Sequence, residues 1–317
     1  MSKRTRLGVG DRPPTKPPTL VGATLLDTYI VEAELGSGAM GSVYRARHVR
    51  LPRHVALKVM HDHLVPEPAL LTRFYREAKA AASLQHPNVV SVLDVGETAE
   101  HKHVMVMELV DGTSLGELME AGVADDRVVP IVLQILSGLE HAHDAGLVHR
   151  DLKPDNVLVD RAGVARIADF GIATLLHPDE PLDRLTGTGV IVGTPLYMSP
   201  EQARAEPVDH RADLYALGII LYELLAGTSP FEGSAMEVAV AKMELDPPPI
   251  AVRVPHVTVD RVLEAFLGKL IARRPDDRFG SAREAKGVLE LYAQDRMRAA
   301  AVLGVIDVER ALSIVTL

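Results

Sequence analysis

The chain has 317 residues, with 43 acidic and 34 basic side chains and a formal net charge of −9 at pH 7. That length suits about two domains, and the acidic balance argues against a nucleic-acid-binding enzyme, whose surface would be basic. Cysteine and tryptophan are absent and aromatic residues make up 4%, which excludes disulfides and thiolate metal sites, argues against base-stacking platforms, and fits a reducing cytoplasm.

Residues 1–24 contain the pairs Pro13-Pro14 and Pro17-Pro18 and show no hydrophobic periodicity. This composition is typical of a disordered tail. A docking role, or binding to an anionic surface, is the alternative, carried by Lys3, Arg4, Arg6, Arg12 and Lys16. No apolar run follows the basic start, so a secretory signal is not expected.

A glycine-rich loop, G-S-G-A-M-G, follows at residues 36–41. The same glycine spacing marks dinucleotide-binding turns, but those lead into a helix, whereas residues 35–59 are predicted to form a β-hairpin. Without Cβ atoms, such a flap can lie over nucleotide phosphates. The candidate nucleotide-binding residues here are Leu35, Gly36, Ser37, Gly38, Ala39, Met40, Gly41 and Val43.

Residues 55–59 alternate as a strand, and Lys58 is its one long cation. We expect this side chain to point into a cleft, although a lysine on an exposed strand face is the alternative. Residues 73–82 are predicted to form the next helix, which contains Glu77.

The most informative stretch is H-R-D-L-K-P-D-N at residues 149–156. Asp151 can accept a hydrogen bond from a substrate hydroxyl, and Lys153 can neutralise charge on a phosphoryl group. Asn156 can offer its carbonyl oxygen to Mg²⁺. A polar turn between two strands is the alternative for these residues.

The tripeptide Asp169-Phe170-Gly171 supplies a carboxylate for the same magnesium ion. A single tripeptide of this kind is weak on its own. It gains weight here because it comes third in an ordered series, after the glycine-rich loop and residues 149–156.

Residues 149–156 closely resemble the catalytic loop of eukaryotic-type protein kinases, and Lys153-Pro154 resembles the Ser/Thr-specific branch of that family. The chain as a whole resembles bacterial Hanks-type Ser/Thr kinases over roughly residues 27–292. The resemblance implies an α+β, bilobal fold. A small antiparallel β-sheet lobe with one main helix would span residues 25–110, and a larger, mainly helical lobe would span residues 111–293.

The resemblance also implies that ATP is bound with Mg²⁺, or alternatively Mn²⁺. Glu77 would pair with Lys58 and hold it against the α- and β-phosphates when its helix swings in. Residues 106–112 resemble the hinge that bonds adenine, with a plain apolar strand end as the alternative. The other nucleotide-binding residues implied are Ala56, Met107 at the back of the pocket, Glu108, Val110 and Leu158.

Residues 193–201 resemble the segment that engages protein substrates, with Ser199 where the family usually has alanine. Thr194 resembles the threonine that bonds Asp151 and Lys153 in Ser/Thr kinases. Two further matches have structural roles in the family: Asp213 would brace the catalytic loop, and Arg278 would pair with Glu201.

The residues between Asp169 and Glu201 would form the activation segment of such a kinase. Thr186 and Thr188 lie in a glycine-flanked part of it. In kinases with an arginine at the place of Arg150, a phosphothreonine in this segment pairs with that arginine and orders the loop. Solvated polar residues are the alternative reading of the two threonines. We expect activation by autophosphorylation.

Residues 283–294 are predicted to form the closing helix of the large lobe, and residues 294–317 continue as an amphipathic extension with near-helical apolar spacing. The longest uncharged run there, residues 299–306, is far short of the ~20 residues that cross a bilayer. We expect no membrane span, and we expect the extension to pack on its own lobe. A dimer or partner surface is the alternative.

The sequence therefore predicts a cytoplasmic kinase that transfers the γ-phosphoryl group of ATP to Ser or Thr of protein substrates. It would not bind nucleic acid, and a homodimer for trans-autophosphorylation is an open option. A pseudokinase would normally have lost Lys58, Asp151 or Asp169, and all three are present. A small-molecule kinase would lack the protein-substrate segment at residues 193–201.

Overall fold

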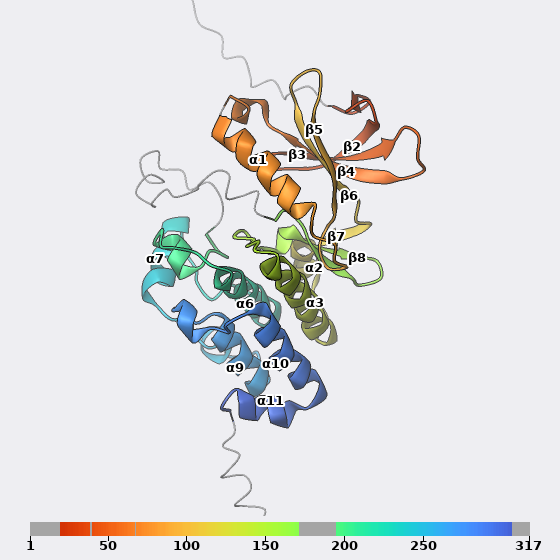
Figure 1. Cartoon of the computed structure of the whole chain (residues 1–317). Coiled ribbons are helices and arrows are strands. Elements are labelled where there is room, and N and C mark those ends of the chain that lie inside the picture. The colour runs from red at the N-terminus through yellow and green to blue at the C-terminus, as the bar shows by residue number, and fades with distance from the viewer. Residues whose placement is uncertain (1–19, 39, 67, 171–194, 306–317) are drawn as a thin grey trace, which may run out of the picture.

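The computed structural model describes residues 20–38, 40–66, 68–170 and 195–305. For Ala69, Arg73 and Glu77 it describes the backbone alone. A β-sheet lobe lies above a larger helical lobe (Figure 1), so the predicted bilobal α+β architecture is confirmed.

The small lobe is built on a six-stranded antiparallel sheet in the order β1-β2-β3-β4-β6-β5. The predicted hairpin at residues 35–59 is part of it. The strands are β1 (Thr24–Leu25), β2 (Tyr29–Ser37), β3 (Gly41–His48), β4 (His54–Met60), β5 (Val92–Glu97) and β6 (His103–Glu108).

Strand alternation gives the sheet two different apolar faces. One face carries Tyr44, Leu57 and Val106, which are paired across β3, β4 and β6 and belong to one buried cluster. The opposite face carries Ala56 and Met107, which pack with helix α1 (Pro68–Ala81). A single sheet therefore has one face for its own core and one face for the helix and the cleft.

Helix α1 begins at Pro68, five residues before the predicted start at Arg73. Proline suits the first helical position because its missing N–H has no intrahelical partner there. Phe74 and Ala78, one turn apart, are buried against the sheet. This spacing places the backbone of Glu77 on the same helix, one residue before Ala78.

The large lobe contains a three-stranded antiparallel sheet, β7 (Gly112–Ser114), β8 (Val157–Asp160) and β9 (Ala165–Ile167), in that order. Its α-helices are α2 (Leu115–Ala121), α3 (Asp125–Asp144), α5 (Pro200–Ala203), α6 (Arg211–Ala226), α7 (Ala235–Glu244), α8 (Ile250–Arg253), α9 (Arg261–Leu270), α10 (Ala282–Gln294) and α11 (Arg296–Val302). Short 3₁₀ turns occur in the large lobe at η2 (Pro154–Asn156) and η4 (Pro275–Asp277), and in the small lobe at η1 (Asp62–Leu64) between β4 and α1.

Helix α6 is apolar on most of its circumference and lies in the centre of the large lobe. Leu214, Leu217, Ile220 and Leu221 are fully buried there. In the described part of the chain, no helix combines the length and apolar character needed to cross a membrane.

The connection between the lobes is tightened by the loop before β5. The backbones of Asn88 and Val90 exchange two 2.9 Å hydrogen bonds with Ile167 of β9, and the Asn88 side chain donates to Ala165 O at 2.8 Å. Gly138 of α3 permits this approach, because a Cβ there would lie 2.7 Å from Asn88 O. A loop of the small lobe is thereby bonded to the large lobe.

The C-terminal extension differs from the continuous helical spacing that the sequence predicts. Helix α11 ends at Val302, and Gly304 adopts a left-handed φ of 69°. The N–H groups of Gly304 and Val305 donate to Ala301 O and Ala300 O, which is the Schellman arrangement that terminates a helix. Before this turn, Ala299 and Ala300 are buried against α9 and α10 side chains. Residues 306–317 of the extension lie outside the described part.

The predicted pair between Arg278 and Glu201 is confirmed as a bidentate contact of 2.7 and 2.8 Å inside the large lobe. Both residues are buried. The guanidinium also donates to the carbonyl oxygens of Ala272, Arg211 and Arg273, so all five of its N–H donors are used. The pair joins the start of α5 to the turn before α10.

Replacing Arg278 by methionine should lower the free energy of unfolding by about 3–5 kcal/mol, because it leaves the Glu201 carboxylate buried without a counter-charge. Urea titration followed by circular dichroism measures this change. Arg283→Met is the matched control, since Arg283 pairs with Glu140 and Asp144 on the surface and should matter much less. Equal losses in both variants would contradict the role given to the buried pair.

Candidate active site

The glycine-rich loop is the tight connection between β2 and β3. Ser37 and Ser42 are paired, and the Gly38 N–H donates to Gly41 O at 2.9 Å. Gly41 must be glycine, because a Cβ there would lie 2.2 Å from Val59 O of β4. Among the described residues, a Cβ on Gly36 would meet no atom within 4 Å, so packing against them does not demand that glycine. Open space above the loop is what a phosphate group would need.

The predicted adenine-binding side chains converge on one apolar cluster beneath this loop. Val43 is paired with Lys58, and Ala56 with Met107, so all four lie on the same face of the sheet. Ala56 and Met107 are buried, and they pack with Met40, Val43, Val110 and Leu158, among others. These residues come from β3, β4, β6, β8 and the loops beside them. Leu35, by contrast, is 53% exposed on β2.

The hinge supplies backbone groups at the edge of this cluster. The N–H of Glu108 is taken by Ser91 O at 3.0 Å. The N–H of Val110 makes no hydrogen bond within the described residues, which leaves a donor next to the apolar cluster. An apolar slot with a backbone donor at its rim suits a purine base.

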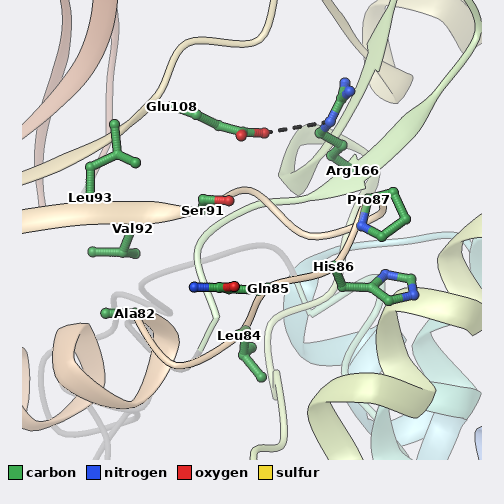
Figure 2. A pocket seen from close by; sticks show the side chains of 10 residues that line it. All are labelled: Ala82, Leu84, Gln85, His86, Pro87, Ser91, Val92, Leu93, Glu108 and Arg166. Atoms are coloured by element: carbon green, nitrogen blue, oxygen red, sulfur yellow. Dashed lines mark ion pairs between the residues drawn. The ribbon is translucent and has the colours of Figure 1, made fainter.

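The Glu108 side chain points the other way, to a groove of about 530 Å³ behind the hinge (Figure 2). There it forms an ion pair with Arg166 of β9 at 3.4 Å. The sequence placed Glu108 among the nucleotide-binding residues, and the structure leaves only its backbone for that role. No sequence signal marked Arg166 as its partner.

Lys58 points into the cleft and pairs with Asp169, at 2.8 Å between Nζ and Oδ2. Its side chain is 11% exposed. Partial burial opposes ionisation of Asp169, but the ammonium of Lys58 outweighs it and holds the pKa of that carboxyl below its usual value. Lys153 acts in the same direction. The predicted Lys58–Glu77 pair stays a prediction, because the Glu77 side chain lies outside the described part.

The catalytic loop is held by its own short contacts. Asn156 donates its amide N–H to Asp151 O at 2.8 Å and to the Asp151 carboxylate at 3.3 Å. Lys153 Nζ lies 3.3 Å from the same carboxylate. Because the amide nitrogen of Asn156 faces Asp151, its carbonyl oxygen is left for another partner.

His149 connects the catalytic loop to Asp169. Its Nδ1 accepts the N–H of Asp151 at 3.2 Å, so its Nε2 carries the proton that is donated to Ala168 O at 2.9 Å. The ring also packs edge-on against Phe170, with centroids 4.9 Å apart. His149 thus contacts the residues on both sides of Asp169, namely Ala168 and Phe170.

Asp213 on α6 braces the catalytic loop, as the sequence predicts. Its carboxylate is fully buried and accepts the backbone N–H groups of His149 and Arg150, each at 2.8 Å. It also bonds His143 Nε2 at 2.8 Å. Arg150 has a φ of 63° and Asp169 a φ of 60°, conformations that cost about 1–3 kcal/mol each for residues other than glycine. The bonds from Asp213 hold the strained backbone of Arg150 in place.

Asn156 and Asp169 form a donor set that fits magnesium. The N–H of Ala168 donates to Asn156 O at 2.8 Å, which keeps the two segments adjacent. In the described residues, no three His, Asp or Glu side chains could hold a metal by themselves. One amide and one carboxylate oxygen suit Mg²⁺, which completes its coordination with substrate phosphates and water at such sites.

Several predicted residues fall outside the described part of the chain. These are Ala39 of the glycine-rich sequence, Thr186, Thr188 and Thr194. Their predicted roles stay predictions.

The chain matches the family model "Protein kinase domain" over residues 29–289. It is 41% identical over 285 residues to the serine/threonine-protein kinase pkn3 of Myxococcus xanthus, covering 88% of this chain and 52% of that protein. It is 40% identical over 277 residues to the serine/threonine-protein kinase PknL of Mycobacterium tuberculosis, covering 86% and 68%. The crystal structure of the M. tuberculosis PknI kinase domain superimposes with a TM-score of 0.68 at 31% identity, covering 87% of this chain and 100% of that one.

The fold and the site thus define a protein kinase, and the chain belongs to the bacterial Hanks-type serine/threonine protein kinases. The family that the sequence predicted is confirmed. The chain spans about half the length of pkn3.

Asp169→Asn should weaken binding of Mg²⁺-ATP while changing binding of metal-free ATP little. The reason is that the amide keeps the shape of Asp169 but offers Mg²⁺ only a neutral oxygen. Titration calorimetry with and without Mg²⁺ separates the two affinities. If the variant bound Mg²⁺-ATP as tightly as the native protein, Asp169 would not be a magnesium ligand.

Proposed function

We propose that this chain transfers the γ-phosphoryl group of ATP to serine or threonine hydroxyls of proteins. The observation that carries the proposal is the placement of Asp151, Lys153 and Asn156 in one hydrogen-bonded loop next to the Lys58–Asp169 pair. Lys153 is close enough to Asp169 to lower its pKa. The residues that orient an acceptor and those that hold phosphates therefore belong to one site.

Asp151 orients the acceptor hydroxyl. Its carboxylate is half-buried and receives Asn156 and Lys153 on one oxygen, so the other oxygen is available to accept the hydroxyl proton. Lys153 stabilises negative charge as the phosphoryl group moves. Catalysis of this kind rests on positioning and on electrostatics.

ATP occupies the apolar cluster between β3, β4 and the hinge, with its phosphates under the glycine-rich loop. Asn156 and Asp169 would hold Mg²⁺, which would supply positive charge to the phosphate oxygens. Lys58 exchanges its contact with Asp169 for phosphate oxygens when the nucleotide enters. Glu77 then holds Lys58 from the helix side.

Activation depends on phosphate in the activation segment. The guanidinium of Arg150 is exposed and makes no ion pair or hydrogen bond within the described residues, although its backbone is fixed by Asp213 and by Gln202. A phosphothreonine at Thr186 or Thr188 brings about −1.5 to −2 charge, which Arg150 can bind. Transfer between two copies of the chain would add this phosphate.

Asp151→Asn should reduce autophosphorylation and transfer to a protein acceptor by roughly 10²-fold or more, because the amide cannot accept the hydroxyl proton. Lys58→Met should abolish both by removing the phosphate contact. Incorporation of radioactive phosphate from Mg²⁺-ATP measures the effect, with circular dichroism to confirm folding. Lys102→Met is the control, since Lys102 pairs with Asp62 at 2.9 Å on the small lobe, outside the site.

The same assay separates the rival functions. A native protein without ATP turnover would be a pseudokinase, and one that phosphorylates sugars or antibiotics in preference to proteins would be a small-molecule kinase.

The double variant Thr186→Ala, Thr188→Ala should turn over more slowly than autophosphorylated native protein and bind ATP equally well, because the residues that the sequence assigns to adenine binding do not include these threonines. Mass spectrometry after incubation with ATP should find phosphate on at least one of them. Phosphatase-treated native protein is the control, and it should resemble the double variant. Equal turnover in all three samples would exclude activation through these threonines.

A further inference from the structure

Lys242 is a buried cation for which the catalytic mechanism has no use. It lies on α7 and is 1% exposed, which places it among the largest fully buried side chains of the described chain. Within the described residues, no carboxylate lies within ion-pair distance of its ammonium. Burying a charge is costly unless it is paired and hydrogen-bonded, so the partners of Lys242 show what it does.

The ammonium of Lys242 binds the backbone of the segment between the activation loop and α5. It donates to Leu196 O and to Met198 O, the second at 3.0 Å. It also lies 5.1 Å from the ring centroid of Tyr215 on α6. Two carbonyl oxygens and a ring face take up the three N–H donors of an ammonium group.

Residues 195–199 form what we call the acceptor platform, part of the segment that the sequence assigns to protein substrates. Its central residue, Tyr197, donates its hydroxyl to Glu223 of α6 at 2.6 Å. Its last residue, Ser199, caps α5 in a reciprocal arrangement with Gln202. Lys242 thus binds the platform on both sides of Tyr197.

The acceptor platform continues directly into the catalytic loop. The Gln202 side chain accepts the backbone N–H of Ser199 through its Oε1, and it donates through its Nε2 to Arg150 O at 2.8 Å. Arg150 precedes Asp151, which orients the acceptor hydroxyl in the proposed reaction. The backbone fixed by Lys242 is therefore two hydrogen-bonded steps from the group that meets the substrate.

We propose that Lys242 is a positioning residue for the acceptor polypeptide: its buried ammonium holds Leu196 and Met198 so that the platform receives a Ser/Thr peptide in register with Asp151. This inference rests on the proposed protein kinase function. It assigns the residue to acceptor binding rather than to ATP binding, because most of the residues assigned to adenine binding lie on β3, β4 and β6 of the other lobe.

The charge state of Lys242 gives the platform a dependence on pH. Burial lowers the pKa of Lys242 to about 7, and Glu223 opposes the shift. The groups that face it are Glu223 and Tyr215 of α6 and Tyr197 of the platform. Below this pKa the ammonium makes charge-assisted bonds to both carbonyls; above it a neutral amine holds them more weakly and loses its attraction to the ring.

Steady-state kinetics with a synthetic Ser/Thr peptide at saturating Mg²⁺-ATP test the proposal. Lys242→Met should raise the KM for the peptide roughly tenfold or more, because two buried carbonyls lose a charged donor, and should leave the KM for ATP unchanged. Lys269→Met is the matched control. Its ammonium also lies over an aromatic ring, Phe279, at 4.5 Å, but it bonds Glu284 instead of the platform.

In the native protein the peptide KM should rise as pH increases through about 7, and this rise should be missing in Lys242→Met. An unchanged peptide KM in the variant, or the same pH profile in both proteins, would overturn the proposal.

Hydrogen–deuterium exchange of residues 196–203 reports on the platform without any catalysis. Exchange there should be faster in Lys242→Met than in Lys269→Met. In the native protein, after correction for intrinsic rates, it should accelerate above pH 7. If the chain had no kinase activity but exchange changed as stated, the proposed function would be wrong and the platform contact right. Active enzyme with unchanged exchange would refute the inference alone, and the native pH series decides it even if Lys242→Met does not fold.

Discussion

The Asp213 carboxylate is the fixed point around which the catalytic loop is arranged. It is fully buried in α6 and binds two consecutive backbone N–H groups of the loop, as well as His143. An isolated carboxylate in such a position would be prohibitively costly, so the acid and the loop depend on each other. The strained φ of Arg150 is the geometric result. From there the contacts continue through His149 and Ala168 to Asp169. The proposed metal ligand and the proposed acceptor-orienting residue Asp151 therefore depend on the same support.

The second constraint is the pleat of the small-lobe sheet. Because residues opposite each other share a face, the register of Val43 with Lys58 and of Ala56 with Met107 places all four side chains on the face where the nucleotide is proposed to bind. A slip of one residue would turn Lys58 into the core and Leu57 into the cleft. The core residues on the other face, such as Tyr44 and Val106, fix the register of the strands. They therefore also determine which side chains face the proposed nucleotide site.

The sequence was sufficient for the parts of the site whose residues are neighbours in the chain. Spacing within residues 149–156 specified Asp151, Lys153 and Asn156, and strand alternation indicated that Lys58 points into the cleft. Contacts between distant segments needed coordinates unless the family resemblance supplied them, as it did for Arg278 and Glu201. The pairing of Lys58 with Asp169, the diversion of Glu108 to Arg166, and the burial of Lys242 depend on side-chain directions that no local pattern encodes. The helix end at Val302 was missed because the apolar spacing continued past Gly304, whose left-handed turn outweighed it.

The hydrogen bonds between residues 88–90 and β9 attach a loop of the small lobe directly to the large lobe. The sequence divides the lobes near residue 110, but a rigid-body rotation of the whole small lobe about that point would break these bonds and the parallel bridge between Val89 and Ile167. A rotation of the small lobe that kept these contacts would have to bend the chain on either side of residues 88–90, at the end of α1 and at the start of β5. The Glu108–Arg166 ion pair is a second contact between the two lobes, joining β6 to β9 behind the hinge (Figure 2). The two lobes are thus held together by these two sets of contacts in addition to the chain that connects them.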